Sequence, residues 1–219
     1  MKHFETDVAV IGCGVAGMTA ALSALESGAK VICIERSTFE ERGGNSRWTD
    51  ANLALKLGQQ EPEWDDAFWA SFERNHGYHV DPEMMAETAS DYASWHPNVK
   101  TAPFLDPELL SAFAEGMPDT VEWLRHHGVD FNMEGKLYPF FLRIMQMPYI
   151  TGGGLEVIDK LTPLIQSKGG EFLCETTAVK LLEDDMGRVC GVRCVGRNNE
   201  PVEVEAKAVI LASGGFEGN

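Results

Sequence analysis

Three glycines near the start of the chain constrain its fold more than any other feature. Gly12, Gly14 and Gly17 follow a short apolar run at 8–11 and precede a segment at 15–27 with apolar residues at helical spacing. In the pattern G-x-G-x-x-G, the first glycine allows a tight turn and the second lets the backbone approach a pyrophosphate. The third lets the helix pack closely on the strand. The context predicts a strand, a phosphate-binding turn and a helix.

A carboxylate stands where such a fold binds ribose. Residues 31–34 form a second apolar run, and Glu35 closes it, at roughly the 20-residue spacing typical of dinucleotide-binding folds. A carboxylate there accepts hydrogen bonds from ribose hydroxyls and disfavours a 2′-phosphate, so NADP is not expected.

Two further glycine turns decide between FAD and NAD. The segment Gly43-Gly44-Asn45-Ser46 offers backbone N–H groups, an amide and a hydroxyl, which suit a second contact with a long cofactor. Residues 208–212 form an apolar strand that runs into Ser213-Gly214-Gly215, at the sheet edge where α/β folds bind ligands. An NAD-dependent dehydrogenase of a different class would lack both turns, so it ranks low.

The segments IGCGVAG, IER, RGGNS and VILASGGF together resemble the FAD-binding domain of the fumarate reductase and succinate dehydrogenase flavoprotein family. Within that family, RGGNSRWTDANL, WLRHHGVDF and ITGGGLEVI look most like the tricarballylate dehydrogenase branch. The resemblance covers essentially the whole chain. It implies an α/β fold of the glutathione-reductase-like Rossmann type, with a parallel sheet, a three-stranded antiparallel meander and a helical insertion.

The resemblance also implies which residues bind FAD. The glycines of the first turn and Ala16 would lie at the pyrophosphate, Glu35 at the adenosine ribose, and Asn45 and Ser46 on the flavin side. None of the six histidines lies in the loop that carries a covalent flavin link in respiratory succinate dehydrogenases, so non-covalent FAD is expected. The full expected set is Gly12, Gly14, Ala16, Gly17, Glu35, Arg36, Gly44, Asn45, Ser46, Ala178, Ala212, Ser213 and Gly214.

Arg143 is the candidate substrate contact. It lies just upstream of Gly152-Gly153-Gly154, where a glycine-rich backbone before a helix at 155–167 could approach the flavin or a substrate carboxylate. The alternative is a flexible loop that enters a helix, and the sequence does not decide between the two.

The expected organisation is a nucleotide-binding core at 1–58 and 150–219, interrupted by a mainly helical insertion at 59–149. The resemblance implies that a capping domain and the C-terminal return of the FAD domain are absent from 1–219, together with the proton-transfer residues. No catalytic residue is therefore assigned. Helices are expected at 64–74, 82–96 and 107–127, and strands at 171–174, 176–183, 189–195, 202–205 and 208–212.

Composition excludes several classes of partner. Eighteen basic against thirty-four acidic residues give a formal charge of −16, which argues against nucleic acid or an anionic membrane surface as a partner. The sequence contains no apolar run long enough to predict membrane insertion, and its first residues do not form an export signal. A cytoplasmic location is therefore expected. Five cysteines without a C-x-x-C pair indicate neither disulfides nor a metal site.

The expected function is hydride exchange between flavin N5 and a C–C bond of a polycarboxylate such as tricarballylate, succinate or fumarate. An electron-transfer partner is compatible with this function. One alternative is a related flavoenzyme of the ketosteroid dehydrogenase or aspartate oxidase type. The other is a folded FAD-binding fragment that is inert alone.

Overall fold

The computed structural model describes residues 1–51, 116, 119–140 and 143–215, without the side chains of 133–148. The chain divides into two units, one formed by Met1–Ala51 with Ile150–Asn219 and the other by Asn52–Tyr149. The helices expected at 64–74 and 82–96, and most of the first half of the one at 107–127, lie outside the described residues.

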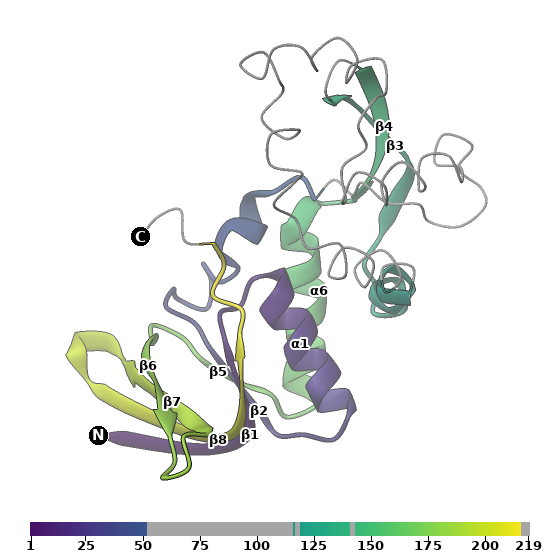
Figure 1. The fold of residues 1–219 in the computed structure, drawn as a ribbon. Helices are drawn as coiled ribbons and strands as arrows, with labels where there is room; N and C mark the ends of the chain where they lie inside the picture. The colour runs from purple at the N-terminus through teal and green to yellow at the C-terminus, as the bar shows by residue number, and fades with distance from the viewer. Residues whose placement is uncertain (52–115, 117–118, 141–142, 216–219) are drawn as a thin grey trace, which may run out of the picture. The chain divides into compact units, whose positions relative to one another are not determined.

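The first unit is built on one six-stranded sheet (Figure 1). Four neighbouring strands are parallel, and two antiparallel strands extend one edge to form the meander. This arrangement confirms the predicted α/β class, because α1 connects the parallel strands β1 and β2 and α6 precedes β5. In spatial order the strands are β5 (Glu171–Leu173), β2 (Val31–Ile34), β1 (Lys2–Ile11), β8 (Pro201–Leu211), β7 (Val189–Val195) and β6 (Thr177–Glu183).

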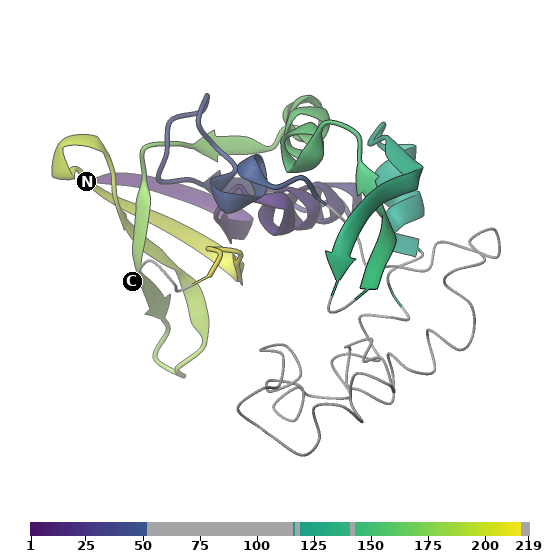
Figure 2. The same ribbon diagram turned by 90° about the horizontal axis from the view of Figure 1, so that it is seen from above.

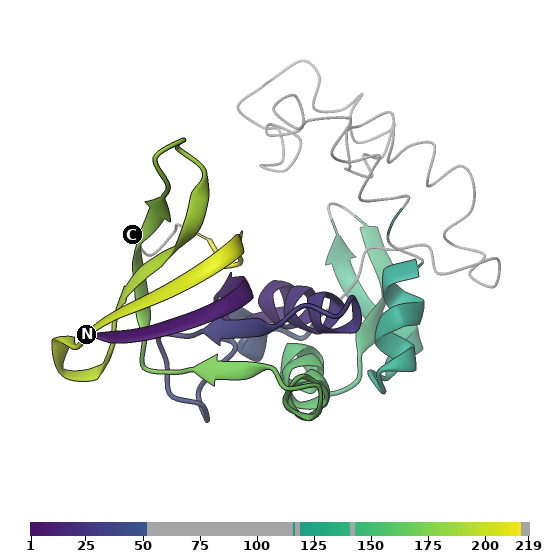
Figure 3. The same cartoon turned by 90° about the horizontal axis from the view of Figure 1, so that it is seen from below.

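Strand β8 corrects the prediction of two separate strands at 202–205 and 208–212. It is continuous from Pro201 to Leu211 and lies beside β1 along nearly its whole length (Figure 3). Its first half also pairs antiparallel with β7, from Pro201 to Glu205. The third strand of the meander is therefore also a central strand of the parallel sheet.

Two helices lie side by side along the sheet, α1 (Val15–Glu26) and α6 (Gly153–Ser167) (Figure 1). Both bury apolar side chains at the three- and four-residue spacing of one helical face. Helix α6 begins two residues before its expected start. The buried apolar residues are Met18, Ala21, Leu22 and Leu25 in α1 and Val157, Ile158, Leu161 and Ile165 in α6.

Two short 3₁₀ turns complete the first unit. The turn η1 (Gly44–Trp48) begins within the second glycine segment and lies beside the start of α1 (Figure 2). The turn η4 (Arg197–Asn199) joins β7 to β8. The first of these turns carries three of the predicted cofactor residues.

The second unit contains a helix at 119–126 and a two-stranded sheet of β3 (Phe131–Phe140) and β4 (Arg143–Ile150). These strands were not predicted from the sequence, which indicated a mainly helical insertion at 59–149. Aromatic and β-branched residues concentrate between 131 and 150, and such residues favour strands. Among the described helices of either unit, none has the length and apolarity to cross a membrane.

Candidate functional site

A cavity of about 610 Å³ opens where the carboxyl ends of β1, β2 and β8 meet. Its wall is formed by the glycine turns after β1 and β8, by η1, and by the residues around the start of β6. The structure thus brings together segments far apart in sequence. Of the predicted cofactor residues, those that line it are Gly12, Gly14, Ala16, Glu35, Arg36, Gly44, Asn45, Ser46, Ala178, Ala212, Ser213 and Gly214.

Gly12 lets the ends of β1 and β8 approach closely. Its φ is +98°, and a Cβ on it would collide with the carbonyl oxygen of Ala212. The N–H of Ala212 donates to the Ile11 carbonyl at 2.9 Å, which ties the two turns together. Gly17 does not line the cavity, because it packs behind the wall, where a Cβ would meet the carbonyl oxygen of Gly12. Its role is close helix–strand packing.

Glu35 is buried at the mouth of the first turn, with 6% of its surface exposed. One carboxylate oxygen accepts the N–H of Cys13 at 3.0 Å and the other accepts the N–H of Ser37 at 2.9 Å. Each oxygen can accept a further hydrogen bond. The carboxylate is therefore fixed in place and retains acceptor capacity toward a ribose in the cavity.

Ser46 caps helix α1 from a distant part of the chain. Its hydroxyl oxygen accepts the N–H of Val15 at 3.1 Å, while the cap residue Gly14 has no side chain to do so. The first N–H groups of a helix lack partners within the helix. With Val15 satisfied by Ser46, the N–H of Ala16 at the cavity wall is available to an anionic ligand.

Arg42 anchors the loop that leads into the second glycine turn. Its side chain is buried and donates to the Thr162 hydroxyl at 2.8 Å and to the Phe39 carbonyl at 2.6 Å. It also lies over the Phe39 ring, 4.3 Å from the centroid, and pairs with Asp159 at 3.4 Å. The segment before Gly43 is thereby attached to α6.

The glycines at 152–154 bring α6 against η1. The N–H of Gly154 donates to the Thr49 carbonyl at 3.0 Å, and a Cβ at Gly154 would collide with the carbonyl oxygen of Ser46. These glycines do not line the cavity. They provide close packing beneath the turn that carries Asn45 and Ser46, a role that was not among the alternatives expected from the sequence.

The pKa values of three cysteine thiols are raised, and one of these thiols, that of Cys13, belongs to a residue that lines the cavity. Cys13 is fully buried, and a hydrogen bond with the Cys33 side chain, together with burial, raises the pKa of its thiol. Burial also raises the pKa of Cys174 to about 11 and that of Cys194 to about 11. All five cysteines are free in the structure. Protonated thiols are poor nucleophiles, so thiol chemistry is not expected at this site.

Eight further residues line the cavity. Gly43 and Gly215 belong to the glycine turns that were expected to contact the cofactor. The other six were not predicted, because strand ends and turn backbones contribute through position rather than residue type. They are Ile11, Cys13, Ile34, Thr176, Thr177 and Leu211. The predicted substrate residue Arg143 begins β4, and its side chain lies outside what the structure describes.

Comparison with known proteins decides the identity of this domain. Residues 7–219 match the family described as FAD binding domain. The chain belongs to this family. The cavity is also large enough for a cofactor, because its volume of about 610 Å³ lies within the range of roughly 300–1,000 Å³ typical of small-molecule and cofactor pockets. The glycine cradle, the helix start and the buried carboxylate complete that fit.

Two curated relatives of this FAD-binding domain are reductases. The chain is 30% identical over 99% of its length to a fumarate reductase (cytochrome) of Shewanella frigidimarina, of which it covers 34%. It is 27% identical over its full length to a vinyl phenol reductase of Lactiplantibacillus plantarum, of which it covers 39%. The chain thus spans little more than a third of these curated relatives.

A solved structure supports the same relationship. The open form of a flavocytochrome c3 fumarate reductase superposes with a TM-score of 0.64 at 26% identity, over 97% of this chain and 34% of that one. The FAD-binding domain is therefore similar to the fumarate reductase flavoproteins in both sequence and fold, as the sequence motifs indicated. Nothing in these comparisons favours the tricarballylate branch.

Proposed function

We propose that this FAD-binding domain serves an oxidoreductase that acts on a C–C bond of a small polycarboxylate, such as fumarate, succinate or tricarballylate. The observation that carries the proposal is the 30% identity to a fumarate reductase over 99% of this chain. In line with that identity, the segments matching the family motifs surround one cavity at the carboxyl ends of β1, β2 and β8.

The role of this chain in the reaction is to bind and orient the cofactor. When bound, FAD supplies hydride exchange at its flavin ring. The N–H of Ala16 and the start of α1 would hold the pyrophosphate, since a helix N-terminus favours anions. Glu35 would accept hydrogen bonds from the ribose, and Asn45 and Ser46 of η1 would contact the flavin side.

We infer that the proton-transfer group lies outside residues 1–219. This chain covers 34% of the fumarate reductase and 39% of the vinyl phenol reductase, so most of each relative's length lies outside the match. We expect the remaining length to hold a capping domain and the return of the FAD domain. An electron-transfer partner, if the enzyme uses one, belongs to the same wider protein.

Assays of the full-length enzyme test the substrate class. The chemically reduced enzyme is mixed with fumarate, and the oxidised enzyme with succinate or tricarballylate, while flavin absorbance is followed. We expect at least one polycarboxylate to change the flavin redox state within the assay. If only a vinyl phenol, a ketosteroid or aspartate does so, the polycarboxylate proposal is wrong and a related flavoenzyme takes its place.

Arg143 remains our candidate for a substrate-side cation. In the full-length enzyme, Arg143→Ala should raise KM for the polycarboxylate while leaving the flavin spectrum intact. Arg188→Ala, an exposed arginine in the turn before β7, is the matched control. An unchanged KM in Arg143→Ala would remove this residue from the proposal.

The non-covalent state of FAD has its own test. The chain is incubated with FAD, desalted, and then precipitated with acid. We expect a flavin band that the folded protein retains and that acid releases into the supernatant. Flavin that stays with the precipitate would contradict a non-covalent site.

A further inference from the structure

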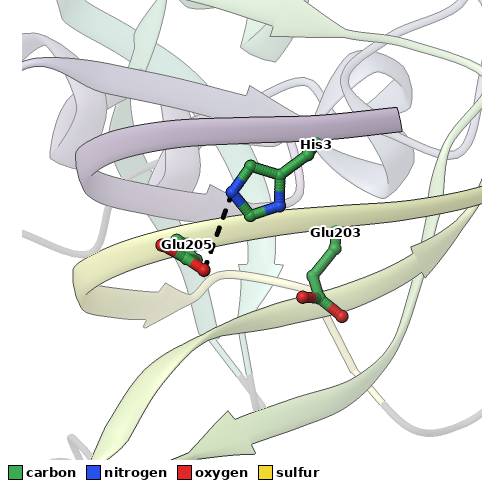
Figure 4. A group of neighbouring side chains, drawn as sticks. All are labelled: His3, Glu203 and Glu205. Atoms are coloured by element: carbon green, nitrogen blue, oxygen red, sulfur yellow. Dashed lines mark ion pairs between the residues drawn. The ribbon is translucent and has the colours of Figure 1, made fainter. Parts of the chain in front are cut away.

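A second cluster of potential ligands lies at the opposite ends of β1 and β8 from the cavity. His3 of β1 and both Glu203 and Glu205 of β8 project from the same face of the sheet (Figure 4). One ligand atom from each residue lies within 4.8 Å of the other two. His3 Nε2 is 3.6 Å from Glu205 Oε1.

We propose that His3, Glu203 and Glu205 bind a divalent transition-metal ion of the Zn²⁺ type. Two ligands on one tetrahedral Zn²⁺, each at about 2.0–2.2 Å, stand roughly 3.3–3.6 Å apart. The separation of His3 Nε2 and Glu205 Oε1 already matches this value. Side-chain rotation is then enough to bring the third ligand into range.

The sheet holds these ligands in place before any metal binds. His3 is the register partner of Glu203, and Glu5 is the register partner of Glu205, in a parallel ladder that continues to Leu211. The backbone positions are therefore fixed by hydrogen bonding between β1 and β8. Only side-chain freedom is lost on binding, which lowers the entropic cost.

The donor set selects the class of ion. An imidazole with two carboxylates suits Zn²⁺ and its neighbours, whereas Mg²⁺ and Ca²⁺ prefer oxygen ligands alone. Two carboxylates balance the charge of a divalent ion, and Glu5, with an oxygen 3.9 Å from His3 Nε2, adds a third negative charge nearby. These groups come from strands some two hundred residues apart, so no short sequence motif announces the site.

Arg193 of β7 opposes metal binding. Its guanidinium lies 3.5 Å from a carboxylate oxygen of Glu203, whose side chain is 19% exposed. The arginine competes with a metal for that carboxylate and adds a repelling positive charge. Removal of Arg193 should therefore tighten metal binding. Non-specific attraction of cations to an acidic protein would give only a weak effect of this kind.

The site is separate from FAD binding. His3 and Ile11 are eight positions apart on β1, which corresponds to about 26 Å at roughly 3.3 Å per residue. Ligand variants should therefore bind FAD as the parent chain does. Retained FAD binding also shows that each variant is folded.

Calorimetric titration of the untagged chain with Zn²⁺ tests the proposal. We expect one site per chain, and affinity lowered about tenfold or more in His3→Gln, Glu203→Gln and Glu205→Gln. This expectation is conservative, because losing even a residue that only supports a ligand costs about 10- to 100-fold. Arg193→Gln should tighten binding, and Mg²⁺ should give no saturable signal.

Glu183→Gln is the matched control, because Glu183 is an exposed carboxylate on β6 of the same sheet and outside the cluster. It should bind Zn²⁺ like the parent chain. Absence of saturable Zn²⁺ binding would overturn the proposal. So would equal weakening in Glu183→Gln and Glu205→Gln, or unchanged affinity in folded His3→Gln.

Discussion

Glu35 and Cys13 are joined by a hydrogen bond in which the Cys13 N–H donates to the Glu35 carboxylate at 3.0 Å. This bond connects the end of β2 to the glycine turn after β1. The sequence pattern assigns the acidic residue only to ribose binding. In the structure the same carboxylate also fixes the turn that receives the pyrophosphate, so one residue shapes two parts of the site.

Replacement of Glu35 by glutamine should weaken FAD binding. The amide keeps one acceptor but directs an NH₂ group toward a backbone N–H or a ribose hydroxyl. A hydrogen bond to a charged group contributes about 1.5–3 kcal/mol, which corresponds to roughly 10- to 150-fold in affinity. Fluorescence titration of FAD measures this change. Glu40→Gln, an exposed neighbour, is the control, and equal affinities in the two variants would contradict the assignment.

Loss of the Ser46 hydroxyl should destabilise α1. In Ser46→Ala the N–H of Val15 loses its acceptor, and loss of a helix cap costs typically about 1 kcal/mol. Urea unfolding measures the free energy of unfolding. Ser167→Ala removes an exposed hydroxyl that only donates to the Leu164 carbonyl at the end of α6, so its effect should be smaller. Equal losses would show that Ser46 does not act as a cap.

Arg42 should matter for stability because its side chain is buried among acceptors. Arg42→Met leaves the Phe39 carbonyl and the Thr162 hydroxyl without their donor, and a buried group left unpaired costs about 1–3 kcal/mol. Arg197→Met is the control, since that arginine is exposed and makes one surface ion pair with Glu175. A thermal or urea melt in which Arg197→Met is as damaging as Arg42→Met would contradict this role.

The sequence predicted the parts of the site that residue type encodes. The three glycines of the first turn and Glu35 have the spacing typical of a strand–turn–helix unit. The structure brings Gly12, Gly14 and Glu35 to one cavity, and Gly17 packs behind its wall. The cap from Ser46 to Val15 was missed because contacts between distant segments leave no local pattern. Prediction of the site thus succeeded where short-range geometry dictates the residue.

Strand β8 shows why the fold was only partly predictable. Its first half alternates apolar and acidic residues, as in a strand with one solvated face, and its second half is mostly apolar. The change of pattern near Ala206 and Lys207 resembles a boundary between two strands. It marks instead the point where the pairing of β8 with β7 stops, near the start of β7, while the pairing with β1 continues.

Asp184 should contribute stability that depends on pH. A backbone hydrogen bond from Arg188, followed by the side chain of the same residue, holds the Asp184 pKa below its ordinary value of 3.8. The native state therefore binds this proton less tightly than the unfolded chain. The contribution is complete above pH 3.8 and disappears as the pH falls through the lowered native pKa.

Asp184→Asn should accordingly be less stable than the parent chain at neutral pH, with a difference that shrinks on acidification below pH 3.8. Urea midpoints across this range measure the difference. Asp185→Asn removes one charge from the same turn and is the control for net charge. A gap between parent chain and Asp184→Asn that stays constant in acid would contradict the linkage.

Gly154 should be the most sensitive position at the start of α6, for steric reasons alone. Its φ lies outside the left-handed region, but a Cβ would stand 2.8 Å from Thr49 Cγ2 and collide with the backbone oxygen of Ser46. Gly154→Ala must push η1 away from α6, and such overpacking costs typically about 1–3 kcal/mol. Because η1 carries Asn45 and Ser46 at the cavity wall, FAD affinity should fall together with stability.

Gly116→Ala is the matched control, since a Cβ there meets open space. Unfolding and FAD titration of both variants test this coupling, and a Gly154→Ala chain that lost stability but bound FAD normally would show that η1 does not position the cofactor.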